Sequence, residues 1–229
     1  MQMGSLKAPG PDNFPGIFYQ AHWEIITADV NEIIKELMHR TENPRHINAT
    51  NLVLIPKVQN PVSVSQFRLI SLCNYSYQVF SKVLANRLKQ PDLISPTQNA
   101  FIVGRQIQDN IGITHELFHF LKMRKAKCKF ELGIKLDMHK AYDRVEWDFL
   151  MAVTEKWGFN NSWRKLIMGC ISSVNFAILL NGHLGSKFAP SRGLRQGDPL
   201  SPYLFHLVNE VLLLLIQQAC DKKRIRGCR

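Results

Sequence analysis

The stretch from Lys135 to Trp147 constrains the fold of this chain more than any other, because it sets an acidic residue at the end of a strand-like pattern and follows it with a helix. Apolar residues at positions 132, 134, 136 and 138 alternate with Gly133, Lys135 and Asp137. This alternation is typical of a strand that is buried on one face. The pattern therefore predicts a strand over 132–138, with Asp137 projecting into a cleft.

A second informative stretch lies further along the chain. Gly193–Pro202 is a polar loop punctuated by Gly and Pro, and it opens into an apolar helix from Pro202 onward. The longest apolar run, Val211–Ile216, is far shorter than the ~20 residues that span a bilayer. We interpret it as part of a core helix and predict no transmembrane segment.

Local patterns predict several other elements. Apolar residues recur near helical spacing after Pro15 and Gly16, and the pair Asn181-Gly182 between two apolar runs is a strong hairpin signal. The elements expected from such patterns are a helix after residue 16, a strand over 51–56, helices over 77–89 and 109–122, and a hairpin over 176–188. The basic connector 124–129 marks a boundary between two lobes.

Composition limits the class of protein. The chain has 229 residues, of which 45% are hydrophobic, enough for one sizeable core or two small lobes. Its formal net charge of +11 favours a polyanionic partner, although a basic protein without such a partner has the same charge. The 5 cysteines show no metal-ligand spacing, which favours a reducing compartment. The N-terminus has no pattern typical of a secretory signal.

Six blocks of the chain, taken in order, resemble motifs of reverse transcriptases. Residues 135–147 resemble motif A and residues 193–202 resemble motif B. The earlier blocks, which resemble the opening motif, the two fingers motifs and the block after them, are Lys7–Asp12, Leu54–Lys57, Phe67–Asn74 and Gln98–Arg105. The residues within these motifs are similar to those of the plant long-interspersed-element branch, which belongs to the non-LTR retrotransposons.

The resemblance implies a fold and a division of the chain. The fold is α+β, with the fingers and the first part of the palm of a right-hand polymerase, and with helices packed on an incomplete antiparallel palm sheet. Residues 1–123 would form the N-terminal motif and fingers, and residues 124–229 a partial palm with motifs A and B. The family's third catalytic motif, an aromatic-Ala-Asp-Asp turn, is expected after motif B, yet no two adjacent aspartates occur in the sequence. We therefore expect a fragment truncated before that motif and inactive alone.

The implied reaction is RNA-directed DNA synthesis. It is a phosphoryl transfer, in which protein groups position the reactants and metal ions neutralise charge. By resemblance, Asp137 is a catalytic carboxylate that bridges two Mg²⁺ ions, with Mn²⁺ as the alternative metal. The carbonyl oxygen of Met138 would complete one coordination shell. The structural alternative for Asp137 is a strand-end residue that caps the next helix.

The resemblance also assigns substrate-binding residues. Lys57 and Arg68 match the fingers contacts to the incoming triphosphate. Tyr142 matches the bulky residue that lies under the sugar and blocks a 2′-hydroxyl. Gln196 and Gly197 match the motif B residues that contact the nucleotide or the template. The structural alternatives are solvated surface cations, a core aromatic residue and an ordinary Gly-rich loop.

The implied partners are an RNA template, a DNA primer or target and deoxynucleoside triphosphates. No membrane is implied, and the expected compartment is intracellular, either the nucleus or the cytoplasm. Two alternatives differ from the interpretation as a retrotransposon reverse transcriptase. One is a non-catalytic nucleic-acid-binding remnant, and the other is a reverse transcriptase or maturase fragment of the group II intron type. The sequence Asp143–Trp147 favours the retrotransposon family over the group II intron type.

Overall fold

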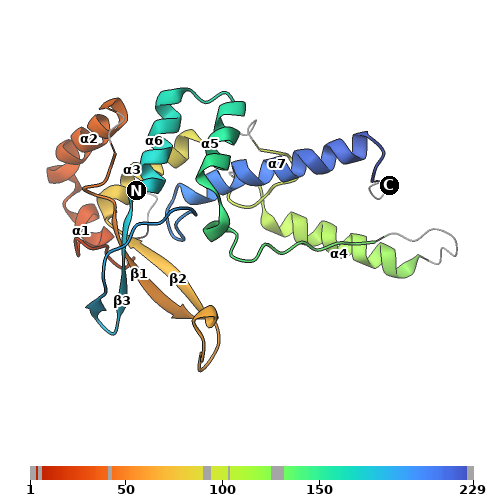
Figure 1. Cartoon of the computed structure of the whole chain (residues 1–229), viewed down its shortest axis with the longest axis horizontal. Helices are drawn as coiled ribbons and strands as arrows, with labels where there is room; N and C mark the ends of the chain where they lie inside the picture. Colours follow the sequence, from red (N-terminus) through yellow and green to blue (C-terminus); the bar gives the residue numbers. More distant parts are fainter. Residues whose placement is uncertain are drawn as a thin grey trace.

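The computed structural model describes residues 4, 7–40, 43–89, 94–102, 104–124 and 132–225. Helices outnumber strands, and the strands project from the helical part as two hairpins (Figure 1). The helices are α1 Gly16–Ala21, α2 Trp23–Arg40, α3 Tyr75–Arg87, α4 Ile107–Met123, α5 Trp147–Lys156, α6 Asn161–Ser172 and α7 Ser201–Asp221. The strands are β1 Ala49–Pro56, β2 Phe67–Cys73, β3 Asn175–Leu180 and β4 His183–Leu184. Short 3-10 helices cover Val64–Gln66 and Tyr142–Arg144.

The four strands form one mixed sheet in the order β2-β1-β3-β4. β1 and β2 pair antiparallel, whereas β1 and β3 pair parallel, with Leu52 opposite Ile178. The α+β class is therefore confirmed, but the sheet is not the antiparallel one expected. One sheet also takes strands from both sides of the expected boundary near residue 124, since β1 and β2 precede it and β3 and β4 follow it.

Most elements with strong local signals are confirmed. The strand expected over 51–56 lies within β1, and the helices expected over 77–89 and 109–122 correspond to α3 and α4. The turn between β3 and β4 has positive φ at both central residues, 49° at Asn181 and 82° at Gly182. Two positive φ values are those of the type I′ turn, one of the two turns favoured in two-residue hairpins. Most of the basic connector 124–129 lies outside the described residues.

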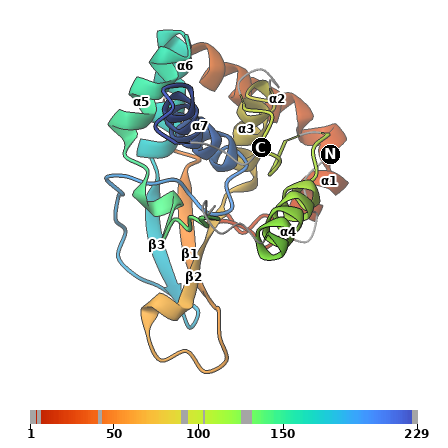
Figure 2. The ribbon, with the colours of Figure 1, turned by 90° about the vertical axis from the view of Figure 1, so that its right-hand side faces the viewer.

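The core lies where α3, α5, α6 and the first half of α7 meet (Figure 2). Helix α3 buries one face of its own, which includes Tyr77, Phe80 and Leu84. On the opposite side, Leu204 of α7 and Leu150 of α5 are fully buried. These apolar contacts hold the loop before α7 and the segment before α5 in one place, and the candidate site is built from both.

The strand expected over 132–138 is absent, which corrects the first prediction. These residues are described, but they adopt no regular structure and all are exposed. A strand needs a neighbour for its backbone hydrogen bonds, and no described strand pairs with this segment. The alternating side chains are consequently uncovered, and Leu132 is 73% exposed. The segment instead lies along α4, where a Cβ at Gly133 would come 2.9 Å from the Phe118 ring.

The run Val211–Ile216 is only partly in the core, contrary to prediction. Its first residues are half-buried, but Leu214, Leu215 and Ile216 are exposed, and Leu215 is 58% exposed. By length and composition alone, α7 is sufficient to cross a membrane, with 21 residues and a mean hydropathy of 1.3. The first half of the same helix packs into the core through Leu204 and Leu207.

Candidate functional site

The hairpin of β1 and β2 brings Lys57 and Arg68 to one face. Arg68 lies opposite Ile55 in the antiparallel register, and paired residues point to the same side of a sheet. Lys57 is two residues beyond Ile55, so it shares that side, and its N–H donates to the Gln66 carbonyl at 2.8 Å. Both basic side chains are exposed. The register thus places both cations on one face of the hairpin, where the Lys57 ammonium donates to the Ser65 carbonyl at 3.3 Å.

The loop before α7 lies against the outer edge of β2. The N–H of Ser71 donates to the Gln196 carbonyl at 3.0 Å. Gly197 has a φ of 105°, and a Cβ there would come 3.2 Å from the Ser71 carbonyl oxygen. Only glycine combines this conformation with so close an approach. The loop therefore covers β2 three residues beyond Arg68, and Gln196 remains half-exposed.

The other end of the same loop is fixed to the segment that follows Asp137. The N–H of Leu194 donates to the Tyr142 carbonyl at 2.9 Å, and the N–H of Gly193 donates to the Val145 carbonyl at 2.8 Å. The Trp147 indole N–H closes the contact by donating to the Gly193 carbonyl at 2.9 Å. The loop is thus hydrogen-bonded both to β2 and to residues 142–147, which joins three of the sequence blocks.

Tyr142 is half-buried, and its ring stacks on Phe205 of α7. The ring centroids are 5.1 Å apart and the planes are inclined by 13°. Burial raises the pKa of the Tyr142 hydroxyl, so the ring is neutral at physiological pH. The stacking fixes the orientation of the ring beside the loop that carries Gln196.

Asp137 was predicted to project from the end of a strand, but residues 132–136 form no strand, and Asp137 and Met138 are both exposed. Among the described residues, Asp137 has no hydrogen-bond or ion-pair partner, and no cluster of three or more His, Cys, Asp or Glu side chains is present. Mg²⁺ accepts one or two carboxylates together with waters and phosphate oxygens. Asp137 and the Met138 carbonyl therefore fit part of one such site. The described residues do not assemble a site for two ions.

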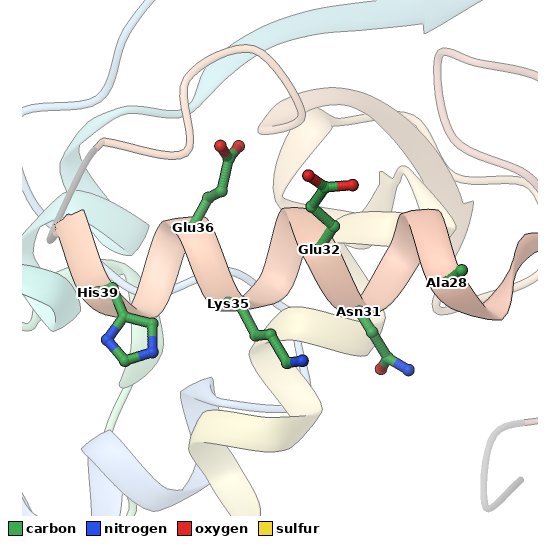
Figure 3. Close-up of a pocket in the computed structure, with 6 residues that line it drawn as sticks. All are labelled: Ala28, Asn31, Glu32, Lys35, Glu36 and His39. Carbon is green, nitrogen blue, oxygen red and sulfur yellow. The ribbon is translucent and has the colours of Figure 1, made fainter.

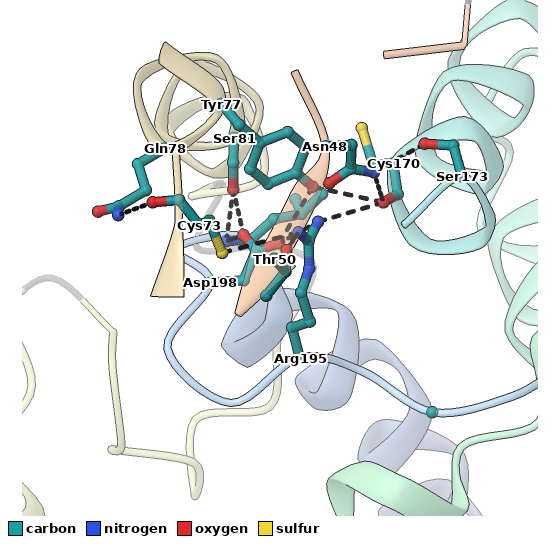
Figure 4. A network of polar contacts seen from close by, with 12 residues as sticks. Asn48, Thr50, Cys73, Tyr77, Gln78, Ser81, Cys170, Ser173, Arg195 and Asp198 are labelled. Carbon is teal, nitrogen blue, oxygen red and sulfur yellow. Dashed lines mark hydrogen bonds and ion pairs between the residues drawn. The ribbon is translucent and has the colours of Figure 1, made fainter. Parts of the chain in front are cut away.

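The charged residues that flank Gln196 and Gly197 are buried, which the sequence analysis missed. Arg195 and Asp198 form an ion pair at 3.1 Å, and each side chain is only 4% exposed. Arg195 also donates to Thr50 Oγ1 at 2.9 Å and to the Cys170 carbonyl at 3.3 Å (Figure 4). Its guanidinium lies 4.2 Å from the centre of the Tyr77 ring. The signal available in the sequence was an Arg and an Asp three positions apart in the loop before α7.

Asp198 is bound by hydroxyls and by a backbone donor. It accepts from Tyr77 Oη at 3.1 Å, from Ser81 Oγ, and from the Leu200 N–H at 2.9 Å. Burial lowers the pKa of Arg195, but the neighbouring Tyr77, Cys73 and Asp198 raise it, and the net shift is upward. Arg195 is therefore charged at every physiological pH.

The N-terminal block docks at the carboxyl end of β2. A Cβ at Gly10 would lie 2.3 Å from the Asn74 backbone nitrogen, so only glycine fits there. The N–H of Asp12 donates to Asn74 Oδ1 at 3.1 Å. This docking brings Lys7 toward α3. Burial lowers the pKa of Lys82, and the positive charges of Lys89 and Lys7 lower it further.

The block at 98–105 contacts α7 through Gln98, whose Nε2 lies 3.2 Å from Nδ1 of His206. Arg105 donates to the carbonyl oxygens of Ser95 and Gln98 at 2.6 and 2.7 Å. Glu210 of α7, which is buried, accepts from the Ser95 N–H at 3.0 Å. These contacts give the block a structural role within the described residues.

A separate open hollow runs along α2. It is lined by Ala28, Asn31, Glu32, Lys35, Glu36 and His39 (Figure 3). All six residues come from one helix, and none belongs to the sequence blocks described above. The hollow is therefore not part of the candidate site.

Comparison with known proteins identifies the class of protein. The sequence profile of the family described as "Reverse transcriptase (RNA-dependent DNA polymerase)" matches residues 55–227. This range contains Lys57, Arg68, Tyr142 and the loop before α7, but only the last two residues of β1. The chain belongs to the reverse transcriptase family.

Relatives point to non-LTR retrotransposons in particular. The chain is 29% identical over 223 residues to the Transposon TX1 uncharacterized 149 kDa protein of Xenopus laevis. The aligned residues cover 96% of this chain and 16% of that protein. It is 29% identical over 206 residues to the Pol polyprotein of the retrotransposable element R2 of Nasonia vitripennis, covering 90% and 19%. It is also 53% identical to the mitochondrial protein AtMg01250 of Arabidopsis thaliana, covering 22% and 42%. The chain spans less than a fifth of the length of the first two relatives.

Proposed function

We propose that this chain forms the nucleotide-binding and template-binding part of an RNA-directed DNA polymerase from a non-LTR retrotransposon. The observation that supports this most is the position of the loop before α7. It bonds to Ser71 of β2 on one side and to Tyr142 on the other. Three blocks that are far apart in sequence thereby border one surface. The proposed substrates are deoxynucleoside triphosphates, an RNA template and a DNA primer or target.

Each side chain at this surface has a proposed task. Lys57 and Arg68 bind the triphosphate, because an ammonium and a forked guanidinium offset its negative charge. Gln196 and Gly197 contact the nucleotide or the template. Tyr142 excludes a 2′-hydroxyl by its bulk. These tasks are binding, orientation and steric exclusion, which account for most of what protein groups contribute to phosphoryl transfer.

The proposed metal site includes Asp137 and the carbonyl of Met138. We assign Mg²⁺ to it, with Mn²⁺ as the alternative. When bound, such an ion neutralises charge on phosphate oxygens. The aromatic-Ala-Asp-Asp motif, which would supply further carboxylates, is absent from these 229 residues, because they contain no adjacent aspartates.

Three finer assignments belong to the same proposal. Residues 1–123 form the N-terminal motif and fingers, and residues 124–229 a partial palm. A plant origin is supported by the 53% identity to the Arabidopsis protein over 51 residues. The protein acts inside the cell, in the nucleus or the cytoplasm, where its template would be found.

Binding of a fluorescent deoxynucleoside triphosphate with Mg²⁺ tests the function. Replacing Arg68 by Met is expected to weaken binding by roughly tenfold or more, because a hydrogen bond to a charged group contributes ~1.5–3 kcal/mol. Arg164→Met is the matched control, since Arg164 pairs with Glu155 between α5 and α6. Equal affinities for the two variants would contradict the assignment of Arg68.

Binding to nucleic acid should depend steeply on salt. The net charge is +11, and Lys7, Lys82 and Lys89 lie close enough for their charges to interact. Phosphate contacts by such lysines release counterions, so affinity falls as salt rises. We expect binding of RNA and DNA without sequence preference, and an affinity loss of at least about tenfold between 50 and 200 mM salt if a few phosphates are contacted. Fluorescence anisotropy at several salt concentrations measures this, and a flat response would count against the proposal.

Tyr142→Ala is expected to relax the selection against ribonucleotides. Removing the ring leaves space for a 2′-hydroxyl, so the ratio of affinities for deoxy- and ribonucleoside triphosphates should fall roughly tenfold, the scale of a single steric contact. Tyr142→Phe is the control, because it keeps the ring that stacks on Phe205. Identical ratios in the Ala and Phe variants would show that Tyr142 is only a packing residue.

A non-catalytic nucleic-acid-binding protein is the second candidate function. It is favoured by one observation, the absence of a cluster of three metal-binding side chains from the described residues. Both candidates predict nucleic-acid binding, but only the polymerase assignment predicts selective binding of deoxynucleoside triphosphates.

A further inference from the structure

Arg195 lies at a particular point of the loop before α7. The residue before it, Leu194, donates its N–H to Tyr142, and the residue after it, Gln196, accepts from the N–H of Ser71. The Arg195 side chain runs in the opposite direction, into the protein, where it is 4% exposed. One buried side chain therefore anchors the loop between its two backbone contacts.

The anchor joins four separate elements. Arg195 donates to Thr50 of β1, contacts Cys73 of β2 at 3.6 Å, and donates to the Cys170 carbonyl of α6. It also lies over the ring of Tyr77 in α3 (Figure 4). A guanidinium presents its donors in a fixed plane, so contacts in several directions fix its orientation as well as its position.

Asp198 completes the anchor on the far side of Gly197. It pairs with Arg195 and accepts from the Leu200 N–H at the start of α7. Gln196 and Gly197 are therefore held between two buried charged residues. A buried ion pair is a weak source of net stability compared with apolar side chains of similar volume. Its contribution here is to orient the loop, because Arg195 and Asp198 each bind several groups that lie in different directions.

We propose that Arg195 is a positioning residue for the nucleotide site. Through its pairing with Asp198, it sets the path of the loop so that Gln196 and Gly197 lie at a fixed spacing from Tyr142 and from β2. Displacing Arg195 shifts the loop and changes nucleotide selection without removing any group that touches the nucleotide. The expected change in nucleotide selection rests on the proposed function, but the position of the loop is measured without any ligand.

Amide hydrogen exchange of the 229-residue chain measures the positioning. Arg195→Lys keeps one charge but loses the forked guanidinium, so the N–H groups of Ser71 and Leu194 should exchange roughly fivefold faster, as expected when a hydrogen bond is weakened by about 1 kcal/mol. The Lys57 N–H, bonded to Gln66 in the hairpin, serves as an internal reference whose exchange stays unchanged. Arg192→Lys is the matched control, because Arg192 lies in the same loop with its side chain 57% exposed.

A second variant covers the case in which Arg195→Lys does not fold. The double change Arg195→Met with Asp198→Asn removes both charges and leaves no buried ion without a partner. It should fold and show the same faster exchange at Ser71 and Leu194. Unchanged exchange at these two amides in a folded variant would overturn the inference.

Nucleotide selection separates positioning from a purely structural role. In Arg195→Lys, the ratio of affinities for fluorescent deoxy- and ribonucleoside triphosphates should fall several-fold at a temperature where the variant is fully folded. A lower melting temperature with an unchanged ratio would overturn the inference and leave the proposed function intact. If the unmodified chain binds no triphosphate while the exchange result holds, the proposed function fails and the positioning of the loop by Arg195 stands.

Discussion

Asp198→Ala is expected to destabilise the chain by about 3–5 kcal/mol, the cost of leaving one member of a buried ion pair without its partner. The Arg195 guanidinium would remain charged in a place where it is 4% exposed. Tyr77, Ser81 and the Leu200 N–H would lose an acceptor at the same time. Since domains of this size are stable by only ~5–15 kcal/mol, this loss removes a large share of the total free energy of unfolding, and the midpoint of unfolding should fall clearly.

Urea denaturation monitored by circular dichroism measures this loss. Glu146→Ala is the matched control, because Glu146 pairs with Arg192 at 3.0 Å but is 59% exposed. Exposed pairs contribute about 0–1 kcal/mol, so the control should unfold close to the unmodified chain. Similar midpoints for the two variants would show that the buried pair does not hold the loop.

The 229-residue chain is expected not to extend a primer on an RNA template, although it belongs to the reverse transcriptase family. Asp137 supplies one carboxylate, and the acidic residues after motif B, Glu210 and Asp221, lie in α7. Glu210 is buried and already accepts from Ser95. Without a second source of carboxylates, we expect incorporation to fall by orders of magnitude, because a two-ion site neutralises charge on both the attacking and the leaving oxygens.

Primer extension with Mg²⁺ and with Mn²⁺ tests this prediction. The positive control is the same chain joined to the aromatic-Ala-Asp-Asp hairpin and thumb of a related reverse transcriptase. Incorporation by the short chain that is abolished in Asp137→Asn would contradict the prediction. Incorporation by neither protein would favour the non-catalytic alternative.

Local signals were sufficient for much of the fold. The Asn181-Gly182 turn needs only two residues that tolerate positive φ, and its hairpin is confirmed. Helices α3 and α4 follow from apolar spacing over a few turns. The strand expected at 132–138 has an equally good local pattern but no partner strand among the described residues. A local pattern cannot supply the hydrogen bonds of a neighbour, and that is why this prediction failed.

The candidate site was less predictable than the fold. Lys57 and Arg68 could be chosen by resemblance, but their common face depends on the pairing of Ile55 with Arg68. The contact of Gln196 with Ser71 joins residues that no short-range rule connects. The Arg195–Asp198 pair was missed because charged residues are usually exposed, and its bond to Thr50 spans 145 positions. Such contacts follow from the fold as a whole.

Photolabelling with a deoxynucleoside triphosphate that carries a photoreactive base tests the central claim most directly. The claim is that the hairpin of β1 and β2, Tyr142 and the loop before α7 border one nucleotide site. We expect the labelled peptides, identified by mass spectrometry, to come from residues 57–68 and from the neighbourhood of Tyr142 and Gln196, and we expect excess unlabelled nucleotide to prevent labelling. Labelling confined to α2 or to the distal half of α7, or labelling that excess nucleotide does not reduce, would contradict the account.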